Sequence, residues 1–315
     1  MRKFQLVIGN KNEKDPQLII DYSPSNPQGC QVQFNIQQSN AGNTVNAEIT
    51  VCNISPYYFT MNQNLFGKPV WLYAGMADSP LLRKIGYSGT YGLIAQGYIS
   101  RVIPEWNGST SVISITFQPF LINNTGNNTP YELYVQAGQD IRQKYKNIYK
   151  LIGGDIQTLN MGNAPIKCIQ SYTGLVYTVA DMSVLLQNQH GLTLQQTSNG
   201  FIISSIIGKT IKLVPGDFLM QPSLVDFRRI SITLMMRSDI QMGDIVTLPP
   251  EIYVGITALD SNANGGYVTD SSEFQKKTIF SLFHGSYFIT DVWQLGDSRN
   301  TEAQAWATII QGNMQ

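Results

Sequence analysis

The sequence predicts a mainly β protein of the α+β class, in which two antiparallel β-barrel domains flank a smaller mixed α/β domain. Two observations predict this arrangement. Apolar and polar residues alternate with a period of two in the first and last thirds of the chain, and helical spacing appears in the middle. A chain of 315 residues is long enough to bury several cores. We therefore expect domains at residues 1–122, 123–225 and 226–315.

The N-terminal domain is predicted to consist of half-buried antiparallel strands. Apolar residues alternate with polar ones in residues 31–37 and again in residues 47–51. Two further strand candidates, residues 99–103 and 112–117, flank the Asn107-Gly108 pair. Because this pair tolerates positive φ angles, it predicts a hairpin turn.

The middle domain begins with a change of pattern. Residues 122–130 lack periodicity and are rich in turn formers, which predicts a boundary or a long loop. Apolar residues then recur at helical spacing from Ile141 to Ile152. Gly153 follows, where a C-terminal cap needs a residue that adopts a left-handed conformation.

A second helix and a hairpin complete the middle domain. Thr178 and Asp181 have the spacing of an N-terminal capping box, and Gly191 follows the last predicted turn. Two short strand candidates then surround the Asn199-Gly200 pair, which predicts a tight turn.

Strand patterns return in the C-terminal domain. Apolar residues alternate over residues 230–236, and a short strand is predicted at 245–248. Residues 260–272 are rich in Asn, Gly and Ser and predict a flexible loop. Two strong strand candidates follow, at residues 287–295 and 303–310.

The charge balance argues against a protein that holds nucleic acid electrostatically. The 21 Lys and Arg residues equal the 21 Asp and Glu residues, and charged residues make up only 13% of the chain. The polar surface must therefore be mostly Asn, Gln, Ser and Thr, which suits permanent assembly partners. Cys30, Cys52 and Cys168 lack metal-ligand spacing, so we expect small core residues in a protein made in a reducing cytosol.

No secretion signal and no membrane span are expected. The basic residues Arg2 and Lys3 precede only a short apolar stretch, and nowhere do 18 apolar residues run together.

The sequence contains no recognisable catalytic, metal-binding or cofactor-binding motif. The two histidines belong to no motif: His190 lies at a predicted helix end, where the helix dipole favours a cation, and His284 lies in a predicted turn. We therefore expect no enzymatic activity, no metal and no cofactor, and a hydrolase is disfavoured.

One charge pattern is a candidate contact surface. Arg142, Lys146 and Lys150 follow one another at intervals of four, which places three cations along one stripe of the first predicted helix, with Lys144 on another face. The stripe is either a contact for phosphates or an acidic partner, or a solvated helix face; the latter is the simpler interpretation.

Six short segments carry a resemblance to a known family. They are residues 47–55 (AEITVCNIS), 67–75 (GKPVWLYAG), 96–99 (QGYI), 240–249 (IQMGDIVTLP), 285–297 (GSYFITDVWQLGD) and 306–308 (WAT). These strand motifs, and the order in which they follow one another, resemble those of bacteriophage tail baseplate hub proteins, a family similar to the phage late control D protein. Cys52 and Ile54 depart from the commoner aromatic residue and Leu.

The resemblance implies a homotrimer at the end of a phage tail tube. Two similar barrels per subunit present six near-equivalent faces to the hexameric tail tube protein, while the other side receives the trimeric central spike protein. Tape-measure and baseplate wedge proteins are further candidate partners, and DNA passes only transiently through the channel. The expected location is the tail baseplate of a virion assembled in the host cytoplasm.

Two other functions compete with the structural hub. An aromatic content of 10% and many Asn and Gln residues suit a receptor- or carbohydrate-binding tail protein. A cell-wall hydrolase is known in some hubs as a fused extra domain, and the three predicted domains leave no room for one.

Overall fold

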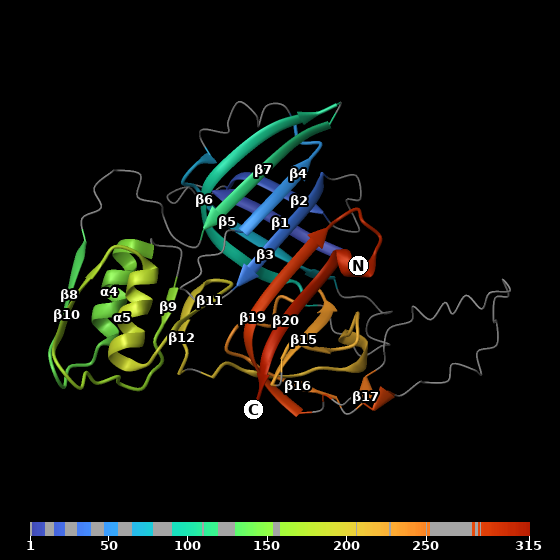
Figure 1. Ribbon diagram of the computed structural model, residues 1–315. Helices are drawn as coiled ribbons and strands as arrows, with labels where there is room; N and C mark the ends of the chain where they lie inside the picture. Colours follow the sequence, from blue (N-terminus) through green and yellow to red (C-terminus); the bar gives the residue numbers. More distant parts are fainter. Residues whose placement is uncertain are drawn as a thin grey trace.

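Figure 1 shows a computed structural model of the 315-residue chain. The structure describes residues 2–9, 16–22, 30–38, 47–55, 65–77, 90–108, 110–118, 130–153, 158–205, 207–226, 228–249, 251–252, 279–280, 283 and 285–315.

One 13-stranded sheet contains strands from both ends of the chain (Figure 1). Across the sheet the strands lie in the order β14-β15-β20-β19-β3-β4-β7-β6-β5-β1-β2, and β16 pairs with both β19 and β13. All pairs are antiparallel except β13–β16. In chain order the strands are β1 (Arg2–Gly9), β2 (Pro16–Tyr22), β3 (Gln31–Gln38), β4 (Ala47–Cys52), β5 (Pro69–Met76), β6 (Gly92–Asn107), β7 (Thr110–Gln118), β13 (Thr210–Lys212), β14 (Ser223–Leu224), β15 (Arg229–Met235), β16 (Ile245–Leu248), β19 (Gly285–Asp297) and β20 (Trp306–Met314).

The mainly β class is confirmed, but the prediction of two closed barrels is not. Among the described residues, β2 pairs only with β1 and β14 only with β15, so the sheet does not close on itself. The ladder between β3 and β19 carries it from the N-terminal strands into the C-terminal ones. One pair of partners in this ladder, Gln33 and Asp297, is 264 residues apart in the sequence. An alternating pattern predicts a strand's buried face but not its neighbour.

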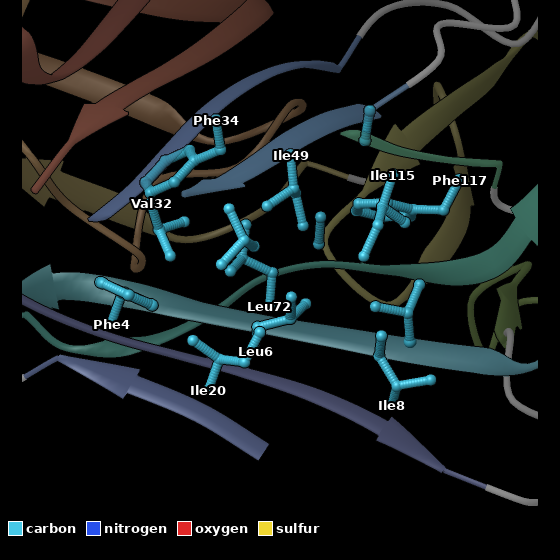
Figure 2. Packing of buried hydrophobic residues seen from close by; sticks show 14 of the residues in the cluster. Phe4, Leu6, Ile8, Ile20, Val32, Phe34, Ile49, Leu72, Ile115 and Phe117 are labelled. Atoms are coloured by element: carbon cyan, nitrogen blue, oxygen red, sulfur yellow. The ribbon is translucent and has the colours of Figure 1, made fainter. Parts of the chain in front are cut away.

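The N-terminal strands form two layers around a common core (Figure 2). Side chains of β1, β2 and β5, such as Leu6 and Leu72, face side chains of β3, β4 and β7, such as Ile49 and Ile115. Met236 and Trp306 from the C-terminal third belong to the same buried cluster.

Strand β6 forms the corner between these two layers. Its first part pairs with β5 and its second part with β7, and the register shifts between Ile99 and Arg101. At this corner a Cβ on Gly97 would lie 2.2 Å from the carbonyl oxygen of Gln118, so only glycine allows the strands to approach so closely. The β6–β7 hairpin ends at the predicted turn, where Gly108 has φ +61°.

The middle of the chain forms a layered α/β unit. Figure 1 shows its two helices between a two-stranded sheet and a three-stranded sheet. Apolar side chains from all three layers share one buried cluster, separate from that of the N-terminal strands. The elements of the unit are β8 (Tyr131–Val135), α4 (Arg142–Gly153), β9 (Thr158–Asn160), β10 (Tyr172–Val176), α5 (Val179–His190), β11 (Leu194–Thr197) and β12 (Gly200–Ile203).

Local sequence signals explain where the second helix begins and ends. The Thr178 hydroxyl accepts a hydrogen bond from the backbone N–H of Asp181, whose carboxylate accepts one from the backbone N–H of Thr178. At the other end, Gly191 adopts the left-handed conformation with φ +67°. The predicted capping box, C-terminal cap and β11–β12 hairpin are confirmed.

The C-terminal strands enclose a third buried cluster, which extends back into the region before residue 226. Strand β13 pairs with β16, and Phe218, just after the 3-10 helix Pro215–Asp217, forms an isolated bridge with Leu234. A second 3-10 helix, Ala303–Ala305, occupies the start of the strand predicted at 303–310. Two short strands, β17 (Glu251–Ile252) and β18 (Ile279–Phe280), pair with each other.

Several predictions remain untested. The division at 122 and 225 stays a prediction. The loop predicted at 260–272, most of the segment 122–130, and His284 lie outside the described residues.

Candidate assembly interface

Side chains reinforce the seam between β3 and β19. Asp297 accepts hydrogen bonds from the amides of Gln31 (Nε2–Oδ1, 3.1 Å) and Gln33 (Nε2–Oδ2, 2.8 Å). Burial alone would raise the pKa of Asp297. The hydrogen bonds from the backbone N–H of Arg299 and from the two glutamines have a larger combined effect, so the pKa lies below its ordinary value. The charged carboxylate therefore ties the N-terminal strands to the C-terminal ones.

Arg2, at the start of β1, holds the loop that precedes β20. Its guanidinium donates hydrogen bonds to the carbonyl oxygens of Asp297 (2.9 Å), Asn300 and Glu302 (2.6 Å). Its Cζ lies 5.9 Å from the centroid of the Trp306 ring. The two ends of the sequence thus meet in one fixed arrangement.

A buried arginine organises the C-terminal strands. Arg237 forms ion pairs with Asp217 (2.8 Å) and Asp239 (2.8 Å). Burial raises the pKa of Asp217 despite the nearby guanidinium, whereas hydrogen bonds from Arg237 outweigh burial at Asp239 and lower its pKa. Both carboxylates contact Arg237, which indicates a structural role.

The α/β unit attaches to the large sheet through its β11–β12 hairpin. The amide of Gln96 on β6 donates a hydrogen bond to the carbonyl oxygen of Asn199 (2.8 Å), and the amide of Gln241 donates one to the hydroxyl of Ser198 (2.8 Å). Neutral amides therefore form the polar contacts at this joint, in line with the low charge content.

The predicted cationic stripe lies on α4, but its three residues differ in their contacts with the rest of the protein. Arg142 pairs with Asp140 (2.6 Å) and donates a hydrogen bond to the carbonyl oxygen of Asn163 (2.5 Å). The hydrogen bonds from Arg142 lower the pKa of Asp140 to about 2. Within the described residues, Lys146 and Lys150 have no ion pair. The stripe's role as an interface or channel surface stays a proposal.

His190 lies at the predicted helix end and is half-buried there. It is the last residue of α5, as expected, but its Nε2 lies 3.0 Å from the hydroxyl of Tyr172, and burial lowers its pKa. Burial therefore favours the neutral imidazole, and stabilisation of a cation by the helix dipole stays a prediction.

The described part of the chain offers no grouping of three His, Cys, Asp or Glu side chains suited to a metal ion. No helix in it is long and apolar enough to cross a membrane. Cys168 is buried as expected, whereas Cys30 and Cys52 are only partly buried, and none of the three forms a disulfide.

The outer face of the β8–β10 pair exposes large apolar side chains beside Glu132 and Thr173, a feature that the sequence patterns did not reveal. Tyr134, Leu175 and Tyr177 are 47%, 54% and 48% exposed, whereas Leu133 and Val176 on the opposite face are buried. Five-residue strands are too short for alternation to predict them well. The unit therefore carries exposed apolar side chains of the kind found at protein interfaces.

Comparisons of the sequence find no relative: no family model and no curated protein matches it. Comparisons of the fold do find neighbours. A tail protein from Neisseria meningitidis MC58 covers 100% of this chain and 97% of its own, with 9% identity and a TM-score of 0.54. The 43 kDa tail protein of prophage MuSo2 from Shewanella oneidensis covers 100% and 98%, with 10% identity and a TM-score of 0.55.

A chain of the PdpA–VgrG complex is also similar. It covers 99% of this chain and 64% of its own length, with 10% identity and a TM-score of 0.52. At these identities the likeness establishes the fold. The chain therefore shares, over its whole length, a fold found in phage tail proteins.

Proposed function

We propose that this protein is a structural component of a phage tail, the baseplate hub, without enzymatic activity. The observation that carries the proposal is the likeness of fold to two tail proteins over essentially the full length of all three chains. The sequence segments that resemble phage tail baseplate hub proteins agree with this likeness of fold.

In this role the hub is a homotrimer that adapts the hexameric tail tube to the trimeric central spike. Each subunit contributes two β regions, so three copies present six of them to the tube. The β3–β19 ladder, Arg2 and Asp297 support this role, because they fix the two β regions relative to each other. An adaptor needs that fixed spacing to match six tube subunits.

The α/β unit extends from the large sheet and is available for other tail proteins, including tape-measure and baseplate wedge proteins. Lys146 and Lys150 on α4 and the outer face of β8–β10 are the proposed contact surfaces. DNA passes the hub only transiently, in line with the zero net charge. The proposed location is the tail baseplate of a virion assembled in the host cytoplasm.

Light scattering on the purified chain tests the oligomer directly. The expected mass is three times the 35.1 kDa of one chain. Mixing this trimer with the tail tube protein and the spike protein encoded beside it should give one complex containing a spike trimer and a tube hexamer. A chain that stays monomeric alone and with both partners contradicts the hub.

The alternative, a receptor- or carbohydrate-binding tail protein, needs a hollow that accepts a sugar. In the described part of the chain, one crevice between β11 and the large sheet has a volume of about 10 Å³, which is room for one water molecule. Its polar lining includes Gln37, Gln38, Gln96 and Gln196. A glycan array separates the two functions, since specific glycan binding by the purified chain favours the alternative.

A further inference from the structure

A chain of three hydrogen-bonding side chains crosses the α/β unit. The hydroxyl of Tyr145 on α4 lies 2.9 Å from the hydroxyl of Tyr172 on β10, which in turn lies 3.0 Å from Nε2 of His190 on α5. The rings pack edge to face: the Tyr172 and His190 centroids are 5.6 Å apart at 63°. The chain thus links both helices to the two-stranded sheet.

One end of this chain is fully buried among apolar side chains, whereas Tyr172 and His190 are half-buried. Tyr145 is fully buried, and Tyr172 packs against the same buried cluster. The other titratable group that acts on the two tyrosines is the buried thiol of Cys168, which donates its own hydrogen bond to the carbonyl oxygen of Gln170. Among the described residues, no charged side chain contributes to the shift of His190, whose pKa is lowered by burial.

The direction of the hydrogen bonds depends on the protonation of His190. When the imidazole is neutral and carries its proton on Nδ1, Nε2 accepts from Tyr172, and the Tyr172 oxygen accepts from Tyr145, so every hydroxyl proton has an acceptor. When His190 is protonated, Nε2 becomes a donor to Tyr172. Tyr172 can then donate only towards Tyr145, and the Tyr145 hydroxyl proton is left without an acceptor in the chain, which is costly because Tyr145 is fully buried.

We propose that Tyr145, Tyr172 and His190 form a pH-sensitive latch, which holds α4, β10 and α5 together while His190 is neutral and loosens them when it is protonated. This inference goes beyond the proposed function and does not depend on it. The latch acts inside the α/β unit, whether or not the unit contacts other tail proteins.

Nitrogen-15 NMR of the full chain tests the hydrogen-bond direction, with His190→Gln used to assign the signals. Wild-type His190 should be the Nδ1–H tautomer and should titrate below 6.5, its ordinary value. Tyr172→Phe removes the donor to Nε2, so the pKa of His190 should rise towards 6.5. An Nε2–H tautomer, or titration that Tyr172→Phe leaves unchanged, overturns the latch.

Hydrogen exchange then tests the loosening. Protection factors in β10 and α4 should fall between pH 7.5 and pH 5, because protonation of His190 removes the acceptor of the Tyr172 hydroxyl. His190→Gln should remove this fall, because its neutral amide keeps an acceptor at both pH values. Tyr177→Phe, an exposed tyrosine just after β10, is the matched control and should retain the fall. A fall that persists in both His190→Gln and Tyr172→Phe contradicts the proposal.

Discussion

The indole Nε1 of Trp306 donates a hydrogen bond of 3.1 Å to the carbonyl oxygen of Gly75, a residue 231 positions earlier in the chain. Both groups are buried, and the Trp306 ring packs against Phe34 with the ring centroids 5.2 Å apart. Strand β20 therefore contributes its first side chain to the core of the N-terminal strands. The two β regions are not independent at this point.

Replacing Trp306 with Phe should destabilise the whole β assembly. Phe cannot donate to the Gly75 oxygen, and its smaller ring leaves space beside Phe34. We expect the free energy of unfolding to fall by about 1–3 kcal/mol. Urea denaturation followed by fluorescence measures the change.

Trp106→Phe is the control for that variant, because Trp106 is 62% exposed near the end of β6. Its effect should stay within about 0.5 kcal/mol. Equal effects of the two substitutions contradict the role given to Trp306.

Gly200→Ala should disrupt the α/β unit. Gly200 has φ +148°, and a Cβ there would lie 2.0 Å from the carbonyl oxygen of Thr158, its partner in the parallel β12–β9 pair. Neither strand can move away without losing that pair. We expect a loss of at least about 2 kcal/mol in the free energy of unfolding, measured by thermal denaturation.

Gly108→Ala is a matched comparison at a glycine with φ +61°. A Cβ there has no neighbour within 4 Å, so only the backbone conformation is penalised. The expected cost is about 1 kcal/mol. If Gly108→Ala costs as much as Gly200→Ala, the steric explanation for Gly200 is wrong.

The stability of the α/β unit should decrease in acid because of Asp140. The folded pKa of about 2 lies below the ordinary 3.8, so the unfolded chain binds the proton more readily. The stabilisation is therefore complete above about pH 4 and is lost as the pH falls towards 2. Asp140→Asn should reduce the difference in urea midpoint between pH 7 and pH 3, whereas the exposed Glu132→Gln should preserve it.

Features that depend on neighbouring residues could be predicted from the sequence. The capping box of Thr178 and Asp181, the cap at Gly191 and the turn at Gly108 each involve residues within a few positions of one another. Sequence patterns describe such local contacts directly, because the chain itself brings the residues together.

Features that depend on distant contacts could not be predicted. The β3–β19 seam joins strands from opposite ends of the chain, and alternation in either strand is compatible with many partners. The hydrogen bond between Tyr172 and His190 could not be predicted for the same reason, since the two residues lie 18 positions apart on different elements. The exposed apolar side chains of β8–β10 became visible only once Tyr134 and Leu175 were placed on one side of two short strands.

Charge reversal along α4 should distinguish a cation that stabilises the fold from cations that do not. The sequence alone predicts that reversing Arg142, Lys146 and Lys150 leaves folding intact, as for any solvated helix face. In the structure Arg142 holds Asp140, which also accepts a hydrogen bond from the backbone N–H of Ile166.

Arg142→Glu should therefore lower the melting temperature, because it places two carboxylates side by side and leaves the carbonyl oxygen of Asn163 without its donor. The Lys146→Glu, Lys150→Glu double variant should have a free energy of unfolding within about 0.5 kcal/mol of that of the wild type, since neither lysine has an ion pair in the described part of the chain. Circular dichroism melting curves compare the two. A double variant as unstable as Arg142→Glu would show that the lysines, too, support the fold, and would remove them as candidate contacts for a partner.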